Sequence, residues 1–362
     1  MKLLLAPMEG IVDYSVRKIL TSLHLQSKET NNGTDTRSVA VANSDKQALN
    51  TNLITPIKSS GIDQCVTEFL RVTDKLIPQH VLLRDFQELK HDGPLKSHTL
   101  SGVPVFAQLL GGDPICITEN ALQLLEMGSL GIDLNFGCPA PTVNRHDGGA
   151  TLLKSPERIF KIVESCRRQI PSHIPVTAKM RLGFDDPNIC LDNAQAIESA
   201  GANHLVVHAR TKMDGYKPPA HWEWLGKIRA KTRIPLIANG DICTLADLQK
   251  CQELSGCQDF MIGRGFLYDP LIFFKLRGIT NPSIPILLPD FFTQFFNESR
   301  ALVNEHYAQA KTKQWLKSMA TKSENMAKIF NVIKYETNPE MFFVQLTELP
   351  RQPLTWSLHS DP

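Results

Sequence analysis

Short apolar segments recur along the chain, and segments with helical spacing separate most of them. The eight apolar segments start near residues 3, 64, 103, 130, 175, 204, 235 and 259. Strands that are buried on both faces of a parallel sheet have this composition. Eight strand–helix units in about 270 residues predict an α/β fold, a (β/α)8 TIM barrel. An open doubly wound sheet is the alternative, but it usually carries G-x-G-x-x-G after its first strand, where this chain reads APMEG at residues 6–10.

The pattern changes outside the strand–helix units. We predict a barrel domain at 1–277, a linker at 278–289, a small all-helical C-terminal domain at 290–350 and a frayed tail at 351–362. Within the barrel domain, residues 26–62 are rich in Ser, Thr, Asn and Lys, which is typical of an inserted, flexible loop. This insertion joins a helix to the next strand and therefore lies away from the active face of a barrel. Deletion of residues 28–58 is expected to leave activity intact.

Charge and cysteine spacing limit the possible functions. The net charge is +2, so nucleic-acid binding requires a local basic patch. The 8 cysteines contain no C-x-x-C, which argues against a zinc or iron–sulfur site and fits a reducing compartment. The apolar start of the chain is too short for a signal peptide, and no later run approaches the ~20 apolar residues of a membrane span. We expect a cytoplasmic protein without a metal, and a monomer.

Polar residues follow nearly every predicted strand, at the end where barrel enzymes have their active sites. Such side chains are costly to bury without partners, so together they favour a pocket over chance surface groups. The candidates for binding a cofactor are Pro7, Met8, Glu9, Gln108, Lys179, His208, Asn239, Gly240, Asp241, Gly263 and Arg264.

The last two strand ends suggest a phosphate, because the loops after strands seven and eight often bind one in barrels. Asn239-Gly240-Asp241 and Gly263-Arg264-Gly265 supply small residues for close backbone approach and one arginine for a bidentate contact. Taken singly, each could be a glycine turn. Lys179 could face an electron-rich ring or extend to water. With Gln108 at a heterocyclic amide edge, these features indicate a flat, phosphate-tailed cofactor, most simply FMN.

Cys138 follows the fourth strand in the run GIDLNFGCP, residues 131–139. A thiol with a pKa of about 8.5 is protonated at neutral pH and can donate a proton beside a flavin. A buried structural thiol is the alternative, and we assign that role to the other cysteines.

A lysine-rich segment lies near the C-terminus. Lysines 311, 313, 317, 322, 328 and 334 accompany one acidic residue, Glu324, over one predicted helix from about Thr312 to Lys334. This pattern is typical of a phosphate-binding face, and equally of an ordinary solvated face. Trp315 is expected in the core.

Ordered motifs carry a family resemblance: LLAPMEG, TEFLRV, QLLGGDP, DLNFGCPAPTVNRHDGGATLL, KMRLGF, VVHARTKMDGY, IPLIANGDI and MIGRG. They resemble the tRNA-dihydrouridine synthases, most closely the bacterial C-type enzyme, which also has a KQWL motif (here 313–316). The insertion at 26–62 departs from the C-type pattern.

The resemblance implies FMN-dependent, NADPH-driven reduction of a uridine C5=C6 bond in tRNA, with uridine 16 of the D-loop as the favoured target. Flavin hydride would go to C6, and Cys138 would protonate C5. The positions implied to approach tRNA are Arg71, Asn135, Asn144 and Tyr216, and the lysine-rich segment adds Lys311 and Lys313.

Two other functions stay open from the sequence. One is an FMN barrel that acts on a small pyrimidine, as dihydroorotate dehydrogenase does; the lysine-rich segment argues against it. The other is a non-catalytic tRNA-binding protein, which the presence of Cys138, Lys179 and Arg264 argues against.

Overall fold

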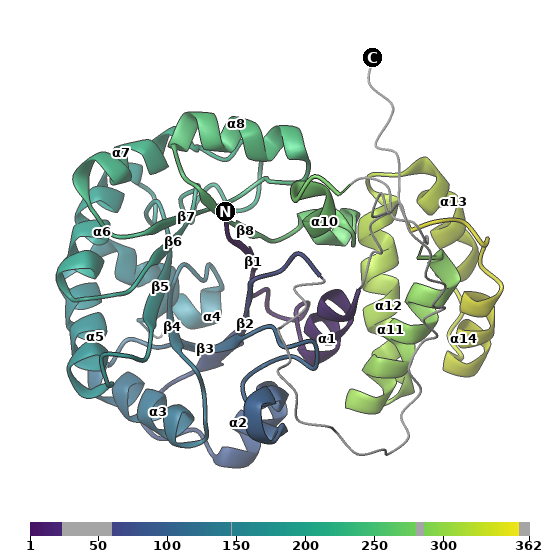
Figure 1. Ribbon diagram of the computed structural model, residues 1–362, viewed down its shortest axis with the longest axis horizontal. Coiled ribbons are helices and arrows are strands. Elements are labelled where there is room, and N and C mark those ends of the chain that lie inside the picture. The colour runs from purple at the N-terminus through teal and green to yellow at the C-terminus, as the bar shows by residue number, and fades with distance from the viewer. Residues whose placement is uncertain (24–59, 146, 280–285, 355–362) are drawn as a thin grey trace, which may run out of the picture.

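The computed structural model describes residues 1–23, 60–145, 147–279 and 286–354. Eight parallel strands close into a barrel in sequence order, because β1 pairs with both β2 and β8 (Figure 1). The strands are β1 Leu3–Leu5, β2 Gln64–Arg71, β3 Val105–Leu110, β4 Ile132–Phe136, β5 Val176–Arg181, β6 Leu205–His208, β7 Leu236–Asn239 and β8 Asp259–Ile262. The predicted (β/α)8 barrel is therefore confirmed, and each strand begins within two residues of its predicted start.

Helices surround the barrel and begin at recognisable signals. Asp113, for example, accepts hydrogen bonds from the backbone N–H groups of Ile115 and Cys116 at 2.9 and 2.8 Å, and Pro114 follows it at the first helical position. The helices are α1 Tyr14–Ser22, α2 Gln79–Asp85, α3 Pro114–Glu126, α4 Pro141–Asn144, α5 Pro156–Gln169, α6 Cys190–Ser199, α7 Glu223–Lys231, α8 Leu245–Ser255, α9 Gly265–Tyr268 and α10 Ile272–Leu276. Short 3-10 turns occur at η1 Gln87–Lys90, η2 Gly93–Leu95, η3 Gly149–Lys154 and η4 Pro187–Ile189.

Side chains fill the inside of the barrel, so the chemistry is confined to its rim. A small apolar cluster inside the barrel consists of Leu4, Ala6, Val66, Val206, Ile237 and Met261. The outward-facing strand residues belong to the larger core that the strands share with the helices. This alternation follows from the two-residue period of a strand.

The C-terminal helices are α11 Leu288–Leu302, α12 Glu305–Ala320, α13 Glu324–Ile333 and α14 Pro339–Thr347, and they lie beside the barrel next to α1 (Figure 1). The prediction of one helix over 312–334 is wrong, because the chain breaks after Ala320 and restarts at the N-cap Ser323, whose hydroxyl accepts from the Met326 N–H at 3.3 Å. Trp315 is buried, as expected, with its ring centroid 4.8 Å from that of Phe295.

Some predicted boundaries also need correction. Helix α11 begins at Leu288, inside the predicted linker 278–289, of which residues 280–285 lie outside the described residues. The predicted tail 351–362 is not frayed at its start, since Leu354 is buried and its N–H donates to the Ile286 carbonyl at 2.7 Å. The insertion at 26–62 lies almost entirely outside the described residues.

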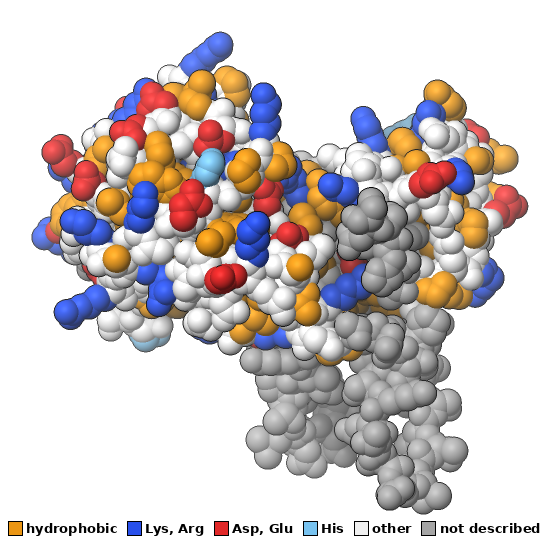
Figure 2. Space-filling model, turned by 90° about the horizontal axis from the view of Figure 1, so that it is seen from above, with side chains coloured by type: hydrophobic (Ala, Val, Ile, Leu, Met, Phe, Trp, Pro, Cys, Tyr) orange, Lys and Arg blue, Asp and Glu red, His pale blue; other side chains and the backbone are white. Residues whose placement is uncertain are grey.

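Charges are mixed on the surface. On the face drawn in Figure 2, Lys and Arg side chains alternate with Asp and Glu side chains over the barrel. Within the described ranges, none of the helices has the length and apolar composition to span a membrane, and no group of three or more His, Cys, Asp or Glu side chains is arranged to hold a metal ion.

Candidate active site

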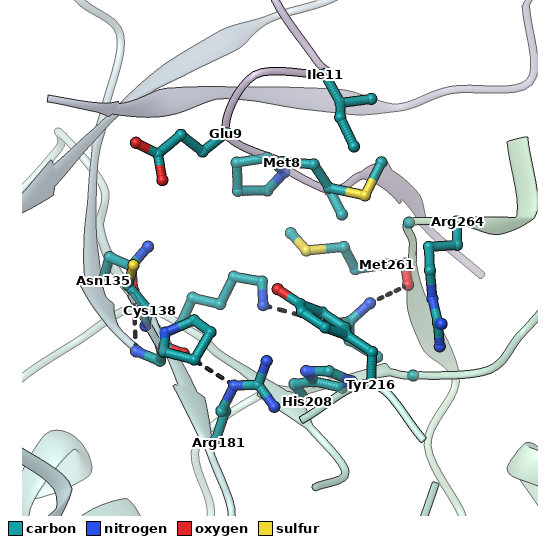
Figure 3. A pocket seen from close by; sticks show the side chains of 18 of the residues that line it. Met8, Glu9, Ile11, Asn135, Cys138, Arg181, His208, Tyr216, Met261 and Arg264 are labelled. Atoms are coloured by element: carbon teal, nitrogen blue, oxygen red, sulfur yellow. Dashed lines mark hydrogen bonds between the residues drawn. The ribbon is translucent and has the colours of Figure 1, made fainter. Parts of the chain in front are cut away.

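A cavity of about 680 Å³ opens at the carboxyl ends of the strands. Cys138 and Arg264 lie on opposite sides of it, with Met8 and Met261 between them (Figure 3). The predicted site residues that line it are Pro7, Met8, Glu9, Gln108, Asn135, Cys138, Lys179, His208, Tyr216, Asn239, Gly240, Asp241, Gly263 and Arg264. Phe69 of β2 also lines the cavity, so all eight strands contribute, directly or through the loop that follows them, to one concave surface.

The backbone around Cys138 is held from two sides. The Asn135 side-chain oxygen accepts from the N–H groups of Gly137 and Cys138 at 2.9 and 3.0 Å. On the other side, the Ala150 N–H donates to the Cys138 carbonyl at 3.0 Å. Gly149 allows this approach, because it has φ +59° and a Cβ there would lie 2.8 Å from the Cys138 carbonyl oxygen. Gly149 thus allows the close packing that holds the Cys138 turn in position.

A chain of buried hydrogen bonds runs from the barrel interior to this turn. The Thr177 hydroxyl donates to Asp133 at 2.5 Å, the Gln108 amide nitrogen donates to the same carboxyl group at 2.7 Å, and the Asn135 amide nitrogen donates to Gln108 at 2.8 Å. The orientation of both amides is therefore set by their partners. Sequence reasoning missed Asp133 and Thr177; the available signal was a carboxylate within an apolar strand.

Burial raises the pKa of the Cys138 thiol, and nearby Glu9 raises it further. Lys179 and Arg181 act in the opposite direction without cancelling the shift. The group is therefore a neutral thiol at neutral pH, with two cations close enough to stabilise the thiolate that proton donation would leave. This is the chemistry of a general acid.

Lys179 extends from β5 into the pocket. Burial lowers its pKa to about 8, and Arg181 contributes to the decrease. The hydrogen bond found for its ammonium within the described residues goes to the Asn239 side-chain oxygen at 3.3 Å, and the Asn239 nitrogen donates to the Met261 carbonyl at 2.8 Å. A buried ammonium has three donors, so Lys179 retains capacity for an acceptor in the cavity.

The opposite end of the pocket is cationic. Asp241, with φ +53°, bridges two arginines: Arg264 donates to one carboxylate oxygen at 2.9 Å and buried Arg210 donates to the other. Arg210 also contacts His208 Nε2 at 3.2 Å. A guanidinium can only donate, so His208 accepts and is neutral. Burial and the surrounding cations accordingly hold the pKa of His208 well below its ordinary value.

Arg181 and Tyr216 complete the rim. Arg181 is buried, donates to the Gly137 carbonyl at 2.9 Å and lies 5.1 Å from the Tyr216 ring centroid. Arg264 lies 5.5 Å from the same centroid. Tyr216 remains 54% exposed, so an aromatic face is available at the mouth of the pocket. Neither Arg181 nor Arg210 is among the site residues predicted from the sequence.

Four predicted positions lie outside the cavity lining. Asn144 donates to the Cys138 carbonyl at 3.3 Å, and exposed Arg71 approaches the Thr142 carbonyl at 3.5 Å, so both lie beside the Cys138 turn. Lys313 is half-buried and donates to the Glu336 carbonyl.

Lys311 lies between the barrel and the C-terminal helices rather than on the surface. Its side chain is 8% exposed. A direct contact with RNA requires an accessible ammonium, so the expectation of an exposed lysine at this position is wrong.

Comparison with known proteins assigns the family. The model of the family described as "Dihydrouridine synthase (Dus)" matches residues 4–347. The chain is 41% identical to the tRNA-dihydrouridine(16) synthase of Pseudomonas putida over 329 residues, which cover 89% of each protein. It is 40% identical to that of Cupriavidus necator over 87% of each protein, and 37% identical to that of Shewanella oneidensis over 94% of this chain and 96% of the relative. The chain belongs to the dihydrouridine synthase family, whose members reduce uridine to dihydrouridine.

Proposed function

We propose that the protein reduces the C5=C6 bond of a uridine in tRNA, at position 16 of the D-loop, with FMN as cofactor and NADPH as reductant. The names of its relatives support tRNA as the substrate and 16 as the position. The observation that carries the chemistry is one cavity with a neutral thiol, Cys138, at one side and Arg264 at the other, and with Lys179 also in its lining. A cytoplasmic monomer remains part of this proposal.

The residues of the pocket fit FMN. Its volume of about 680 Å³ lies within the ~300–1,000 Å³ of small-molecule sites. Lys179 has unused donors for an electron-rich ring, and Met8 and Met261 offer an apolar surface against which a ring can pack. At the other end, Arg264 and the glycine turns at Gly240 and Gly263 suit a phosphate.

Reduced FMN would supply a hydride to C6 of the uracil. The Cys138 thiol holds the proton that C5 must then receive, so that the C5=C6 double bond becomes single and both carbons gain a hydrogen. The thiolate left on Cys138 is stabilised by Lys179 and Arg181 until it takes a proton from water. Asn135 keeps the backbone of the turn in place throughout. Its side-chain oxygen accepts from two backbone N–H groups, and neither hydrogen bond involves the thiol that loses the proton.

Mass-spectrometric mapping of dihydrouridine in tRNA tests the proposal. A host strain that lacks its own position-16 activity is complemented with the wild-type gene, and dihydrouridine is expected to return at position 16. An unmodified position 16, in cells that contain folded protein, would contradict the proposed target. Purified protein that shows no flavin absorbance after reconstitution with FMN would contradict the cofactor. Reduction of a free pyrimidine in place of tRNA would favour the small-molecule alternative.

A further inference from the structure

The loop between β1 and α1 supplies one wall of the pocket. Pro7, Met8, Glu9 and Ile11 all line the cavity. The loop turns tightly, with the N–H groups of Ile11 and Val12 both donating to the Met8 carbonyl, at 3.0 and 2.9 Å. The carbonyl groups of residues 10 and 11 accept hydrogen bonds from partners outside the loop.

Those partners come from the helical domain. The Lys311 ammonium, on α12, donates to the carbonyl oxygens of Ile11 at 2.7 Å and Gly10 at 3.2 Å, and it lies 3.1 Å from an Asp13 carboxylate oxygen. An ammonium has three donors, and these three acceptors match them. Since the side chain is only 8% exposed, its charge is satisfied by the loop and not by water.

Asp13 completes a small interdomain cluster with Lys311 and Tyr307. Its carboxylate caps α1 by accepting from the Val16 N–H at 3.1 Å, and it also accepts from the Ser15 hydroxyl at 2.6 Å and from the Tyr307 hydroxyl. Helix α1 lies between the barrel and the helices α11 and α12 in Figure 1, so this cluster sits where the two domains meet.

We propose that Lys311 is a positioning residue for the flavin pocket: by holding the carbonyls of residues 10 and 11, it keeps the β1–α1 loop in the conformation that binds FMN. The inference rests on the proposed function, because it takes FMN as the ligand. Without the ammonium, the part-buried carbonyls of residues 10 and 11 lose their shared donor and Asp13 loses its counter-charge, so nothing from α12 holds this part of the loop in place. The barrel itself stays closed, because β1 is paired on both sides.

The test compares two lysines of the same domain interface. Lys18 on α1 pairs with Glu298 on α11 at 2.5 Å and is not among the residues that line the pocket. The affinity of flavin-free protein for FMN is measured by quenching of flavin fluorescence in wild type, Lys311→Met and Lys18→Met. Thermal unfolding followed by circular dichroism is measured in parallel. Lys311→Met is expected to weaken FMN binding about tenfold, equivalent to ~1.4 kcal/mol, while Lys18→Met lowers only the melting temperature.

Each outcome decides a different point. Wild-type protein that does not bind FMN overturns the proposed function and this inference with it. Normal FMN affinity in folded Lys311→Met overturns the inference alone, as does an equal loss of affinity in Lys18→Met. If Lys311→Met does not fold, Asp13→Asn takes its place, because asparagine keeps the helix cap while removing the charge that holds Lys311. A folded Asp13→Asn protein is expected to bind FMN about threefold more weakly, roughly 0.6 kcal/mol by the same conversion, and unchanged binding overturns the inference.

Discussion

Two cysteines, Cys138 and Cys243, line the pocket, and their surroundings affect the pKa values of the two thiols differently. Burial raises the pKa of Cys243 to about 11, and the nearby carboxylates of Asp247 and Asp241 add more to this increase than Arg264 and Lys322 take from it. Burial also raises the pKa of Cys138, with a smaller contribution from Glu9, but a hydrogen bond from the Ala140 backbone N–H and the charges of Arg181 and Lys179 oppose the shift. A proton donor must pass through its thiolate form, and the cations favour that form at Cys138.

Replacement of Cys138 by alanine is therefore expected to reduce the rate of dihydrouridine formation by at least about 100-fold, the usual scale of general acid catalysis. FMN binding is expected to remain. The rate is measured by mass spectrometry of tRNA in single-turnover reactions. Cys116→Ala, which removes a half-buried thiol on α3 outside the pocket, is the control and should behave as wild type. Undiminished activity of the Cys138 variant would refute the proton-donor role.

From the pKa of Lys179 we expect the affinity for FMN to depend on pH. Its pKa is lowered from 10.5 to about 8, so the folded protein carries the ammonium below about pH 8 and loses it above, whereas the unfolded chain keeps it up to about 10.5. This buried charge lowers the free energy of unfolding below pH 8, and the penalty is relieved as pH rises from 8 to 10.5. A ligand that accepts from the ammonium binds best in the charged form.

We expect FMN affinity to fall as pH rises through about 8, with a slope of up to about tenfold per pH unit above that value. Lys179→Met should bind weakly at every pH and show no such decrease. Fluorescence titrations at about pH 7 and about pH 9 measure both proteins. A wild-type affinity that is the same at both pH values would contradict a contact between FMN and the Lys179 ammonium.

At the scale of elements, two segments hold the Cys138 turn in place. Strand β4 ends at Phe136, and the 3-10 segment η3 begins at Gly149 against the carbonyl of Cys138. The thiol therefore lies between two elements that are separated along the chain and joined through one close backbone approach. Any side chain at residue 149 must displace the turn or η3.

Gly149→Ala is expected to lower the free energy of unfolding by about 1 kcal/mol or more, because alanine is strained at positive φ, and to reduce dihydrouridine formation beyond what this loss explains. Gly93→Ala is the matched control, since Gly93 has φ +56° but open space around a Cβ. Urea unfolding and the tRNA assay are measured for both variants. Equal activity in the two would show that the contact with Cys138 is unimportant.

The break between α12 and α13 places the lysines of the lysine-rich segment in different environments. On one continuous helix the six lysines would form a single basic region, but in the structure Lys317, Lys322 and Lys328 are exposed, Lys313 and Lys334 are half-buried, and Lys311 is buried. Helical spacing alone could not distinguish these environments, because the helix end depends on the Ser323 cap and on packing against α11. The segment thus attaches the helical domain to the barrel through Lys311, and fewer of its lysines are exposed than one continuous helix suggested.

For the whole molecule, the mixed charge on the face drawn in Figure 2 leads us to expect that tRNA binding depends on particular lysines near the pocket. Lys322 is exposed, lies 5.5 Å from the ring centroid of Tyr268 on α9, and acts electrostatically on pocket residue Cys243. An exposed cation beside the pocket can contact the phosphate backbone of an RNA whose uridine enters the cavity. Lys322 is therefore a better candidate for this contact than Lys311.

Lys322→Ala is expected to weaken tRNA binding and to reduce the dependence of the binding constant on salt by about one unit of log–log slope. Lys328→Ala is the control, because Lys328 is exposed but already paired with Glu324 at 3.1 Å. Filter binding of tRNA at several salt concentrations measures both. A salt dependence identical to wild type in Lys322→Ala would exclude a phosphate contact at this position.

Residue type and periodicity in the chain were sufficient to predict the barrel, its eight strands and the gathering of Cys138, Lys179 and Arg264 at one rim. The physical reason is that short apolar runs separated by helical segments allow few arrangements, and parallel strands bring their carboxyl ends to one edge. The sequence motifs at the ends of these strands also carried the resemblance to the family.

Contacts between residues that are distant in the sequence could be identified only from the folded structure. Asp133 meets Gln108 only through the register of neighbouring strands, and Lys311 meets Gly10 across 301 positions of the chain. A lysine in a sequence has a charge but no assigned face, because its burial depends on which acceptors the rest of the chain brings to it. Local patterns thus specified the strands and the chemistry at their ends, whereas long-range packing determined which polar groups hold that chemistry in place.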